Sequence, residues 1–469
     1  MPRKKEIADK SHTTSRRDFI KLTGLSVASF LAPVSGLTQG WNDLSLFGGT
    51  DSKSKVAATK ADNYERAYIR QKVEHLFDSL GGISDIMKTG STVAIKINLT
   101  GGSYWADHPK LNGVDVRECM WNHPEVLRAV GELIIDSGVS PGRITIVESL
   151  WDTACYTQFG YQDVQQYLGA QMVNLNNSAP YTSFCTRSTG SNPFFYESFI
   201  LNQILDEIDV FVSVTKMKQH IIAGMTHSMK NLVGIAPLQF YQMQGDTGTR
   251  SKLHHEGGIP TYHLPRSICD LNMARPIHLA VIDGIKNAIG GEGAWAPAFE
   301  PYEHQVLLAG KDPVATDSVA TKIFWQDPEG EKMLLPDGQL TDNHLYLAHQ
   351  KGMGTNQLSE IESVGDGADG IFGVGDDLIS SGNRVRLHQN QPNPFSETTV
   401  IRFYLPDSQF IRIKIYDNSG NEICRLTEGK YSSGEHQIEW NAGSTPAGIY
   451  HCVLQSRNMS MSTKMIHRF

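Results

Sequence analysis

The chain has 469 residues, of which 40% are hydrophobic and 20% charged, and its formal net charge at pH 7 is -8. This composition is typical of a globular protein with room for a large core and a second domain, and it excludes bulk disorder. The negative net charge argues against a nucleic-acid binder that works by overall electrostatics.

The first predicted element is an export signal. The segment "SRRDFIKLTGLSVASFLAPVSG" begins with Arg16-Arg17 and continues into a modestly apolar stretch. It resembles a twin-arginine signal, whereas a basic amphipathic helix or a Sec signal with an incidental arginine pair are the alternatives. The stretch is too short and too polar for a stable transmembrane span. We therefore predict a twin-arginine-like signal peptide over residues 1–36, the twin-arginine translocase as a partner, and a polar linker over 37–62.

Residues 63–378 are predicted to form an α/β core. Runs that are apolar throughout are separated by segments with a helical pattern. One such helical segment, "HPEVLRAVGELIIDSG", has Pro124 near its start and Gly138 at its end. Fully apolar strands between helices indicate a mostly parallel sheet covered on both faces. The strands are expected at Val93–Ile97, Ile144–Val147, Val210–Val214, His278–Ile282 and Val306–Ala309.

Polar residues follow each of these strands, and ligands of open parallel sheets bind beyond the carboxyl ends of the strands. The first strand leads to Lys96 and Asn98, and the third to a run of three lysines and two histidines over 216–230. We expect the third strand to end near Thr215, with Lys216 and Lys218 projecting differently, and Thr226 to open a short helix. The carboxyl ends of the five strands would then lie along one rim of the sheet. The other residues at this rim would be Glu148-Ser149, Asp283-Gly284 and Gly310-Lys311-Asp312.

We expect this rim to form a cationic pocket for phosphate or carboxylate, because lysine is rarely concentrated after buried strands. The alternative is that these residues are solvated strand ends and helix caps. Asp283 and Asp317 could hold a metal or orient a lysine, and His220 with His227 could act as an acid–base pair. No metal site is predicted, and the identity of any cofactor is open. The candidate catalytic residues are Lys96, Lys218, His220, Lys230 and Asp283, and the candidate cofactor-binding residues are Asn98, Lys216, Thr226 and Asn231.

Five segments of the core resemble the family catalogued as domain of unknown function 362. They are "VAIKINL", "NHPEVLRAVGELI", "VFVSVTKMKQHIIAGMTHSMKNLVGI", "HLAVIDGI" and "LLAGKDPVATDSVA", and the resemblance covers roughly residues 63–378. The strongest part is Lys216-x-Lys218-x-His220. Some relatives carry an iron–sulfur module, whereas the six cysteines of this chain include no C-x-x-C pair. The resemblance therefore implies a fold and no reaction.

Three smaller motifs have structural interpretations that we favour. The segment "LHHEGGIPTYH" contains His254, His255, Glu256 and His263, but it is not an H-E-x-x-H motif, and a solvated loop is expected. The "GGEG" at 290–293 is expected to be a flexible lid. The Gly/Asp-rich segment 364–378 lacks the order of a calcium loop, so a flexible turn region is expected.

Residues 384–469 are predicted to form a small antiparallel β-sandwich. Short β-rich runs such as "VIRFYL", "IRIKIYD" and "GIYHCVL" alternate with turns such as "DNSG" and "STPAG". The order of these motifs, from "QNQPNPF" to "TKMIHRF", resembles the type A C-terminal sorting domain of the type IX secretion system. A generic adhesive sandwich is the alternative. Whether Cys424 and Cys452 form a disulfide is open.

Together these patterns predict a secreted or cell-surface protein that reaches its destination through the periplasm and uses the type IX secretion machinery. Its core would bind an anionic small molecule or cofactor, with acid–base, transfer or redox chemistry as options. A non-catalytic surface ligand-binding protein and a structural surface protein are the alternatives. Convergence of Lys96, Lys216, Lys218, Lys230 and Asp283 on one cleft would favour a pocket.

Overall fold

The computed structural model describes residues 53–102, 104–105, 108, 110–111, 113–245, 250–256, 258–367, 385–456 and 459–468. The predicted export signal at 1–36, the first part of the predicted linker and most of the Gly/Asp-rich segment 364–378 lie outside these residues.

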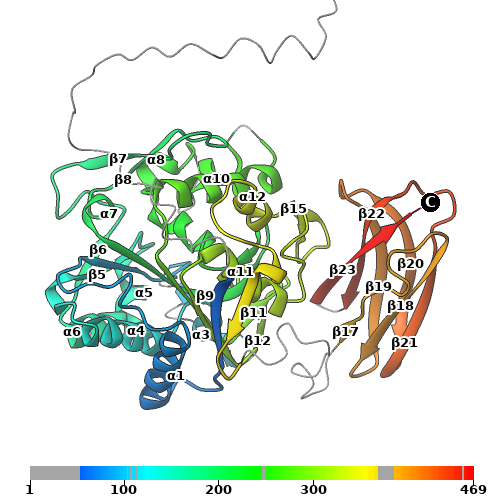
Figure 1. The fold of residues 1–469 in the computed structure, drawn as a ribbon, viewed down its shortest axis with the longest axis horizontal. Coiled ribbons are helices and arrows are strands. Elements are labelled where there is room, and N and C mark those ends of the chain that lie inside the picture. The colour runs from blue at the N-terminus through cyan, green and yellow to red at the C-terminus, as the bar shows by residue number, and fades with distance from the viewer. Residues whose placement is uncertain are drawn as a thin grey trace, which may run out of the picture. The chain divides into compact units, whose positions relative to one another are not determined.

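A ten-stranded, mostly parallel sheet organises the α/β unit, which confirms the predicted fold class (Figure 1). Its main path runs β16 (Ile361–Val364), β1 (Ser54–Lys60), β13 (Val306–Gly310), β11 (Leu279–Ile289), β9 (Val210–His220), β2 (Val93–Lys96), β5 (Ile144–Glu148) and β6 (Gln171–Asn174). The strands from β11 to β6 are parallel neighbours, and β13 is antiparallel to both β11 and β1. Off this path, β10 (Gly224–Thr226) pairs with β9 and β12 (Glu300–Tyr302) with β11.

Helices lie on both sides of this sheet (Figure 1). On one side are α1 (Arg66–Ser79), α4 (Pro124–Asp136) and α6 (Tyr161–Leu168). On the other are α10 (Pro260–Ala274) and α12 (His344–Gln350), and α11 (Pro313–Ile323) contacts α12. The shorter helices are α3 (Arg117–Met120), η2 (Pro141–Arg143), α5 (Thr153–Gln158), α7 (Ile204–Glu207), η3 (Lys230–Ile235), α8 (Leu238–Tyr241), α9 (Ser251–His255) and η4 (Leu358–Glu360). Small two-stranded sheets pair β3 (Lys110–Leu111) with β4 (Val114–Asp115), β7 (Phe184–Ser188) with β8 (Ser198–Asn202), and β14 (Lys332–Leu334) with β15 (Leu340–Asp342).

Local sequence accounts for the helix starts as predicted. Pro124 occupies the first turn of α4, and the ring of His123 accepts a hydrogen bond from the Glu125 amide at its amino end. Pro313 begins α11 in the same way, and the Asp312 carboxylate accepts from the Ala315 amide. Proline is favoured at the first helical position because its missing N–H would have no partner there.

Three expectations about the strands were wrong. Part of the predicted linker, 54–60, forms β1 in the sheet. β13 is antiparallel to its neighbours, so Lys311 and Asp312 leave the sheet at the opposite edge from the parallel strands. β9 does not end near Thr215 but continues to His220, and β10 pairs with this extension.

The C-terminal strands form two antiparallel sheets, as predicted for a sandwich. One has the order β17 (Arg386–Leu387), β18 (Thr398–Leu405), β21 (Gly434–Asn441), and the other β20 (Glu422–Tyr431), β19 (Gln409–Asp417), β22 (Gly448–Ser456), β23 (Met459–His467). Alternate residues of β18 and β19 are buried, among them Ile401, Phe403, Ile411, Ile413 and Ile415. These side chains belong to one apolar core.

Cys424 and Cys452 are both free thiols. Each is paired in register with Ile415, one from the strand on either side of β19. Two strand spacings separate them, about 9.6 Å, which is beyond the reach of a disulfide.

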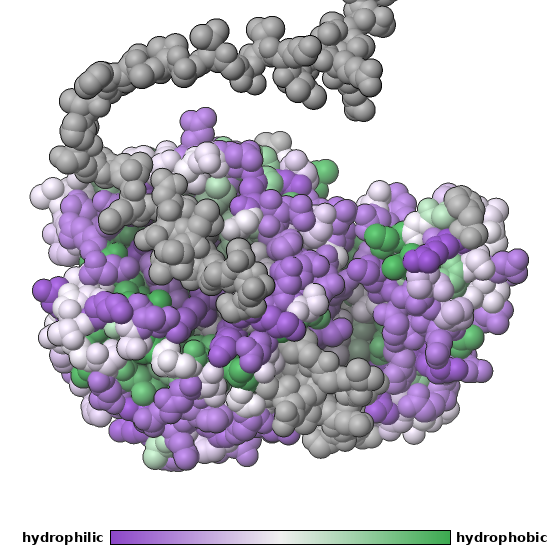
Figure 2. Space-filling view, in the orientation of Figure 1, coloured by the Kyte–Doolittle hydropathy of each residue, from purple (hydrophilic) through white to green (hydrophobic). Residues whose placement is uncertain are grey.

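Hydrophilic residues dominate the face of the molecule drawn in Figure 2, and the hydrophobic ones are scattered over it. In the described part of the chain, no helix combines the length and apolar composition that a membrane span requires.

Candidate functional site

A cavity of about 380 Å³ opens where four parallel strands end. β2 leads into Lys96 and Asn98, and β5 into Glu148 and Ser149. β9 ends at His220, and β11 leads to Glu292 and Trp295. The remaining lining residues are Leu99, Thr100, Trp151, Ile221, Ile222, Thr226, Lys230, Asn231, Val233, Gly234, Arg250, Ser251, His254 and His255.

Lys96 and Glu148 form a buried ion pair in the wall of this cavity. The Lys96 ammonium lies 2.8 Å from Glu148 Oε1, and it also donates to the Ile97 carbonyl and to Asn231 Oδ1. Burial lowers the pKa of Lys96, and the Glu148 carboxylate opposes that shift. All three protons of the ammonium have acceptors and Glu148 compensates its charge, so Lys96 has no free donor for a ligand.

Gly234 and Asn231 keep this pair in place. A Cβ atom on Gly234 would lie 2.7 Å from Lys96 Nζ and 2.8 Å from Glu148 Oε1, so a larger residue there would force the pair to shift. Asn231 Oδ1 accepts from Lys96 and from Asn98 Nδ2, and its Nδ2 donates to Ser213 Oγ. The side-chain amides of both asparagines are thereby oriented.

Lys230 differs from Lys96 because its ammonium has no hydrogen-bond or ion-pair partner among the residues that the structure describes. It lies at the start of η3 and is only partly buried. Desolvation lowers the pKa of Lys230 to about 8; Glu292 opposes this shift, whereas Arg250 and Lys96 add to it. The Glu292 oxygens are already used by the Ile221 amide and the Trp295 indole.

Arg250 is the third cation of the cavity. Its guanidinium donates to the carbonyls of Ala236 and Ser149, and burial lowers its pKa to about 10. The lining therefore contains three cations and two carboxylates, a formal excess of one positive charge. Since Lys96 and Glu148 neutralise each other, the excess resides with Lys230 and Arg250, opposite Glu292.

Two histidines of the cavity are held in opposite tautomers. His220 Nδ1 accepts hydrogen bonds from the amides of Ile222 and Ala223, at 3.0 and 3.1 Å, so its proton is on Nε2. His254 Nδ1 lies 2.9 Å from the Arg250 carbonyl and must donate to it, so its Nε2 is an acceptor. The ring centroids are 6.3 Å apart. Burial lowers both pKa values, that of His254 to about 4, so both rings are neutral at pH 7.

Three buried polar oxygens of lining residues have no hydrogen-bond partner within the described part of the chain. They are Asn98 Oδ1, Ser149 Oγ and Thr226 Oγ1. Each of these residues is at most 5% exposed. These oxygens are also closed to solvent, so an occupant of the open cavity would contact them only if neighbouring side chains moved.

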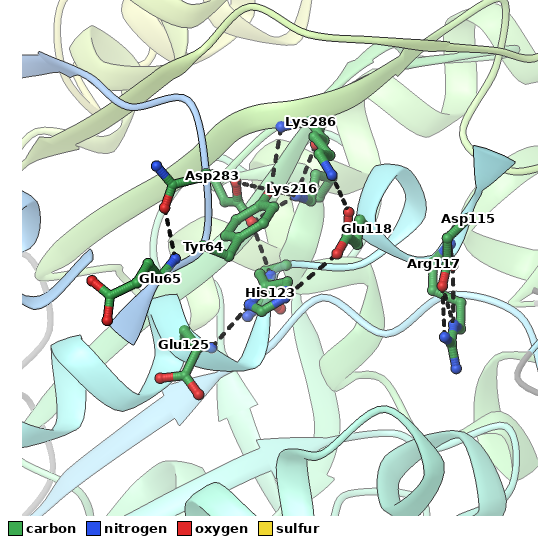
Figure 3. Close-up of polar contacts among 12 residues, drawn as sticks. Tyr64, Glu65, Asp115, Arg117, Glu118, His123, Glu125, Lys216, Asp283 and Lys286 are labelled. Atoms are coloured by element: carbon green, nitrogen blue, oxygen red, sulfur yellow. Dashed lines mark hydrogen bonds and ion pairs between the residues drawn. The ribbon is translucent and has the colours of Figure 1, made fainter. Parts of the chain in front are cut away.

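Lys216 and Asp283 do not line the cavity, which corrects the expectation of one converging cluster. They form a fully buried ion pair, with the ammonium 2.6 Å from Asp283 Oδ2 (Figure 3). Lys216 also donates to Tyr64 Oη and the Lys286 carbonyl. Asp283 accepts from Tyr64 Oη and the His123 amide. The ammonium protons of Lys216 and both oxygens of Asp283 therefore have partners within the protein.

Lys218 also lies outside the cavity lining. Its ammonium donates to the Met120 carbonyl, and desolvation lowers its pKa to about 7. Because β9 is continuous, Lys216 and Lys218 share one face of the strand, and the expectation that they project differently was wrong.

The turn before Lys230 also differs from the prediction. Thr226 ends β10 and does not open a helix; the following helix, η3, starts at Lys230. Asp317 accepts from the amides of Ser228 and Met229 and from Ser228 Oγ, so it fixes this turn. His227 is buried and is not part of the cavity lining, so it does not form an acid–base pair with His220 there.

Sequence reasoning missed several residues of the cavity. The segment expected to be a solvated loop instead contains the end of helix α9, which contributes His254 and His255, and the start of α10. The "GGEG" segment contributes Glu292, whose carboxylate is hydrogen-bonded to the Ile221 amide. In the described ranges, no three His, Cys, Asp or Glu side chains are grouped so that they could hold a metal ion.

The fold and the site define an α/β protein with a partly cationic cavity at the carboxyl ends of parallel strands, followed by a β-sandwich. Residues 93–322 match the family described as "Domain of unknown function (DUF362)", and residues 391–468 match "Secretion system C-terminal sorting domain". The central part of the α/β unit is thus similar to the first family, and the sandwich is a sorting domain of the type IX system. The chain is therefore a secreted or cell-surface protein that uses the type IX secretion machinery.

Among curated proteins, the thylakoid-associated protein sll1697 of Synechocystis is 26% identical over 275 residues, which is 58% of this chain and 75% of that protein. Among solved structures, dimeric latent PorU from Porphyromonas gingivalis matches 19% of this chain at 22% identity, with a TM-score of 0.16. PorZ, a surface component of the type IX system of the same organism, matches 30% at 16% identity, with a TM-score of 0.13. The matches span 9% and 15% of those two proteins, and such low scores carry no argument about fold or function.

Proposed function

We propose that the α/β unit binds an anionic small molecule in the cavity, with Lys230 as its main electrostatic contact. The observation that carries this proposal is the contrast between two cavity lysines. Lys96 has three protein acceptors, whereas the Lys230 ammonium has none among the described residues. A buried or partly buried cation without a counter-ion costs folding free energy, and such a cost is typical of a functional site.

The surroundings of Lys230 support an anion in particular. Arg250 adds a second cation, and the Glu292 oxygens accept from the Ile221 amide and the Trp295 indole. His220 adds a neutral N–H donor from the end of β9. A carboxylate or phosphate supplies the acceptors that these donors lack. A purely structural surface protein would leave this unpaired cation unexplained.

The test is a titration of the full chain with a matched pair of probes, cyclohexanecarboxylate and its neutral amide, cyclohexanecarboxamide, followed by calorimetry. We expect the carboxylate to bind more tightly than the amide. Lys230→Met should remove this preference and weaken carboxylate binding about tenfold to a hundredfold, because a charge-assisted hydrogen bond contributes about 1.5–3 kcal/mol.

Lys60→Met is the matched control, because Lys60 is exposed at the end of β1 and is not a lining residue. It should bind both probes as the parent chain does. Equal affinities of the parent chain for the carboxylate and the amide, or unchanged carboxylate binding by Lys230→Met, would show that the cavity is not an anion site.

We also propose that export across the inner membrane uses the twin-arginine translocase. The proposal rests on the sequence around Arg16-Arg17, which lies outside the described residues. Replacing both arginines by lysine should leave the protein in the cytoplasm, because lysine does not reproduce the guanidinium fork. Cell fractionation measures this, with Arg3→Lys as the control in the same segment. Normal surface delivery of the double variant would contradict this route.

A further inference from the structure

We infer that the ligand of this cavity is a hydroxylated ring that carries an acid group, that is, a sugar acid or a sugar phosphate. The inference rests on the proposed anion site and adds the chemical class of the ligand. It is carried by the acceptor nitrogen of His254, which an anion alone cannot satisfy, by the neighbouring donor of His220, and by the aromatic side chains at the mouth of the cavity.

The acceptor comes first. His254 Nε2 is an acceptor, because Nδ1 of the same ring donates to the Arg250 carbonyl. A carboxylate or phosphate dianion has no proton to give to this atom, whereas a hydroxyl group has one. A ligand that satisfies His254 therefore carries an O–H or N–H group besides its anion.

A donor of the lining lies near this acceptor. His220 offers Nε2–H, and its ring centroid lies 6.3 Å from that of His254. A hydroxyl group both accepts and donates hydrogen bonds, so the hydroxyls of one ring match a neighbouring donor and acceptor of this kind.

The mouth of the cavity provides a surface for the face of such a ring. Trp151 and Trp295 line the cavity and are each 40% exposed, which is unusual for indole side chains. Trp295 is held by the hydrogen bond from its indole to Glu292, and its ring lies 6.4 Å from that of Trp105. Exposed, fixed aromatic rings favour a ligand with an apolar C–H face. A pyranose has such a face and hydroxyls at its edge.

The size of the site agrees with this class. A cavity of about 380 Å³ lies in the range of small-molecule sites and accommodates one sugar unit. Lys230 would then contact the acid group, and the acceptor on His254 would contact a hydroxyl. Carboxylate and phosphate are both compatible with one ammonium, so the probes below include both.

The experiment measures binding to the full chain by calorimetry with four probes of one ring size. D-glucuronate and glucose 6-phosphate carry an acid group and hydroxyls, cyclohexanecarboxylate carries the acid group alone, and methyl glucoside carries hydroxyls alone. We expect glucuronate or glucose 6-phosphate to bind at least tenfold more tightly than both cyclohexanecarboxylate and methyl glucoside. Which of the two binds more tightly assigns the acid group as carboxylate or phosphate.

Variants then assign the hydroxyl contacts. His254→Phe should weaken binding of the preferred sugar probe about tenfold, and by more than it changes the binding of cyclohexanecarboxylate. His75→Phe, at an exposed position on α1, is the control and should change neither. Thermal unfolding of each variant shows whether it is folded. The comparison of the four probes uses the parent chain alone, so it tests the inference even if a variant does not fold.

The outcomes separate this inference from the proposed function. If cyclohexanecarboxylate binds in preference to its amide but the sugar probes bind no better, the anion site stands and the sugar is wrong. If no anion binds in preference to its neutral counterpart, the proposed function and the inference both fail. If the sugar probes are preferred but folded His254→Phe retains that preference, the assignment of His254 to a hydroxyl is wrong.

Discussion

Lys230→Met should stabilise the empty protein, because it removes a cation that folding desolvates without supplying a partner. Burial lowers the pKa of Lys230 from its ordinary 10.5 to about 8. A difference of one in pKa corresponds to about 1.4 kcal/mol, so the complete change is about 3 kcal/mol. Lys230 is only partly buried and solvent screens a charge at such a position, so we expect a gain of about 1–3 kcal/mol.

The pH dependence of this gain has a definite sign. A lysine whose folded pKa lies below its unfolded value destabilises the folded state while it is protonated in both states, that is, below about pH 8. The cost fades as the pH rises from about 8 to 10.5, because the folded protein releases this proton first. The variant and the parent chain should therefore differ most at about pH 7 and converge toward about pH 10.

This pH dependence of the stability difference assumes that the neighbours of Lys230 do not change their own charge over the same pH range. The charged and titratable groups whose fields reach it come from β2, β9, α9, α12, the residue before α9 and the segment after β11. They are Lys96, Lys218, His220, Arg250, His254, Glu292 and His344. Of these, Lys218 has a pKa of about 7, so the comparison should begin at about pH 6, where it is protonated.

Differential scanning calorimetry of the full chain at about pH 6, 7, 8.5 and 10 measures the effect. For a domain of roughly 300 residues, the unfolding entropy makes 1 kcal/mol worth about 1–2 °C, so a rise of about 2–5 °C is expected at pH 7. Lys60→Met should leave the midpoint within about 1 °C of the parent. A lower midpoint for Lys230→Met would show that the ammonium has a stabilising partner, and the argument for an empty anion site would fail.

Three other changes test the structural interpretation. Lys216→Met should destabilise the protein by about 3 kcal/mol in chemical denaturation, because it leaves the Asp283 carboxylate buried without its counter-ion; unchanged stability would contradict this pair. Gly234→Ala should lower the free energy of unfolding by about 1–3 kcal/mol in the same measurement, since its Cβ would contact Lys96 Nζ at 2.7 Å. Unchanged stability would mean that the Lys96–Glu148 pair can shift at little cost. Deleting 384–469 should retain the protein in the periplasm, as fractionation and immunoblotting would show, and surface delivery of the truncated chain would refute the sorting role.

The strands of the core could be predicted because their burial leaves a local signature. A parallel strand covered on both faces is apolar along its whole length, and β2, β5 and β9 begin with such runs. β1 lacks this signature: "SKVAATK" has small side chains, and it pairs with β13 and β16 from far along the chain. Long-range pairing of this kind leaves no trace in the local pattern, so the segment resembled a linker.

Strand direction could not be predicted for the same reason. β13 follows β11 and lies beside it, yet it runs antiparallel. The sequence between them does not reveal whether the chain crosses over the sheet or returns along it. Our assumption that all exits meet at one rim therefore failed for Lys311, which pairs with Asp85 instead.

The lysines of the rim separate into two classes that their sequence context does not distinguish. Lys96 and Lys216 each follow or continue a buried strand, and each meets a carboxylate from the neighbouring strand, Glu148 and Asp283. Those partners lie far away in the sequence, so only the register of the sheet brings them together. Lys230 has no such neighbour among the described residues because it stands on η3, beyond the end of the sheet. A lysine inside a sheet can be neutralised by the adjacent strand, whereas one beyond its carboxyl edge needs a ligand or bulk water, and this difference identifies Lys230 as the proposed functional cation.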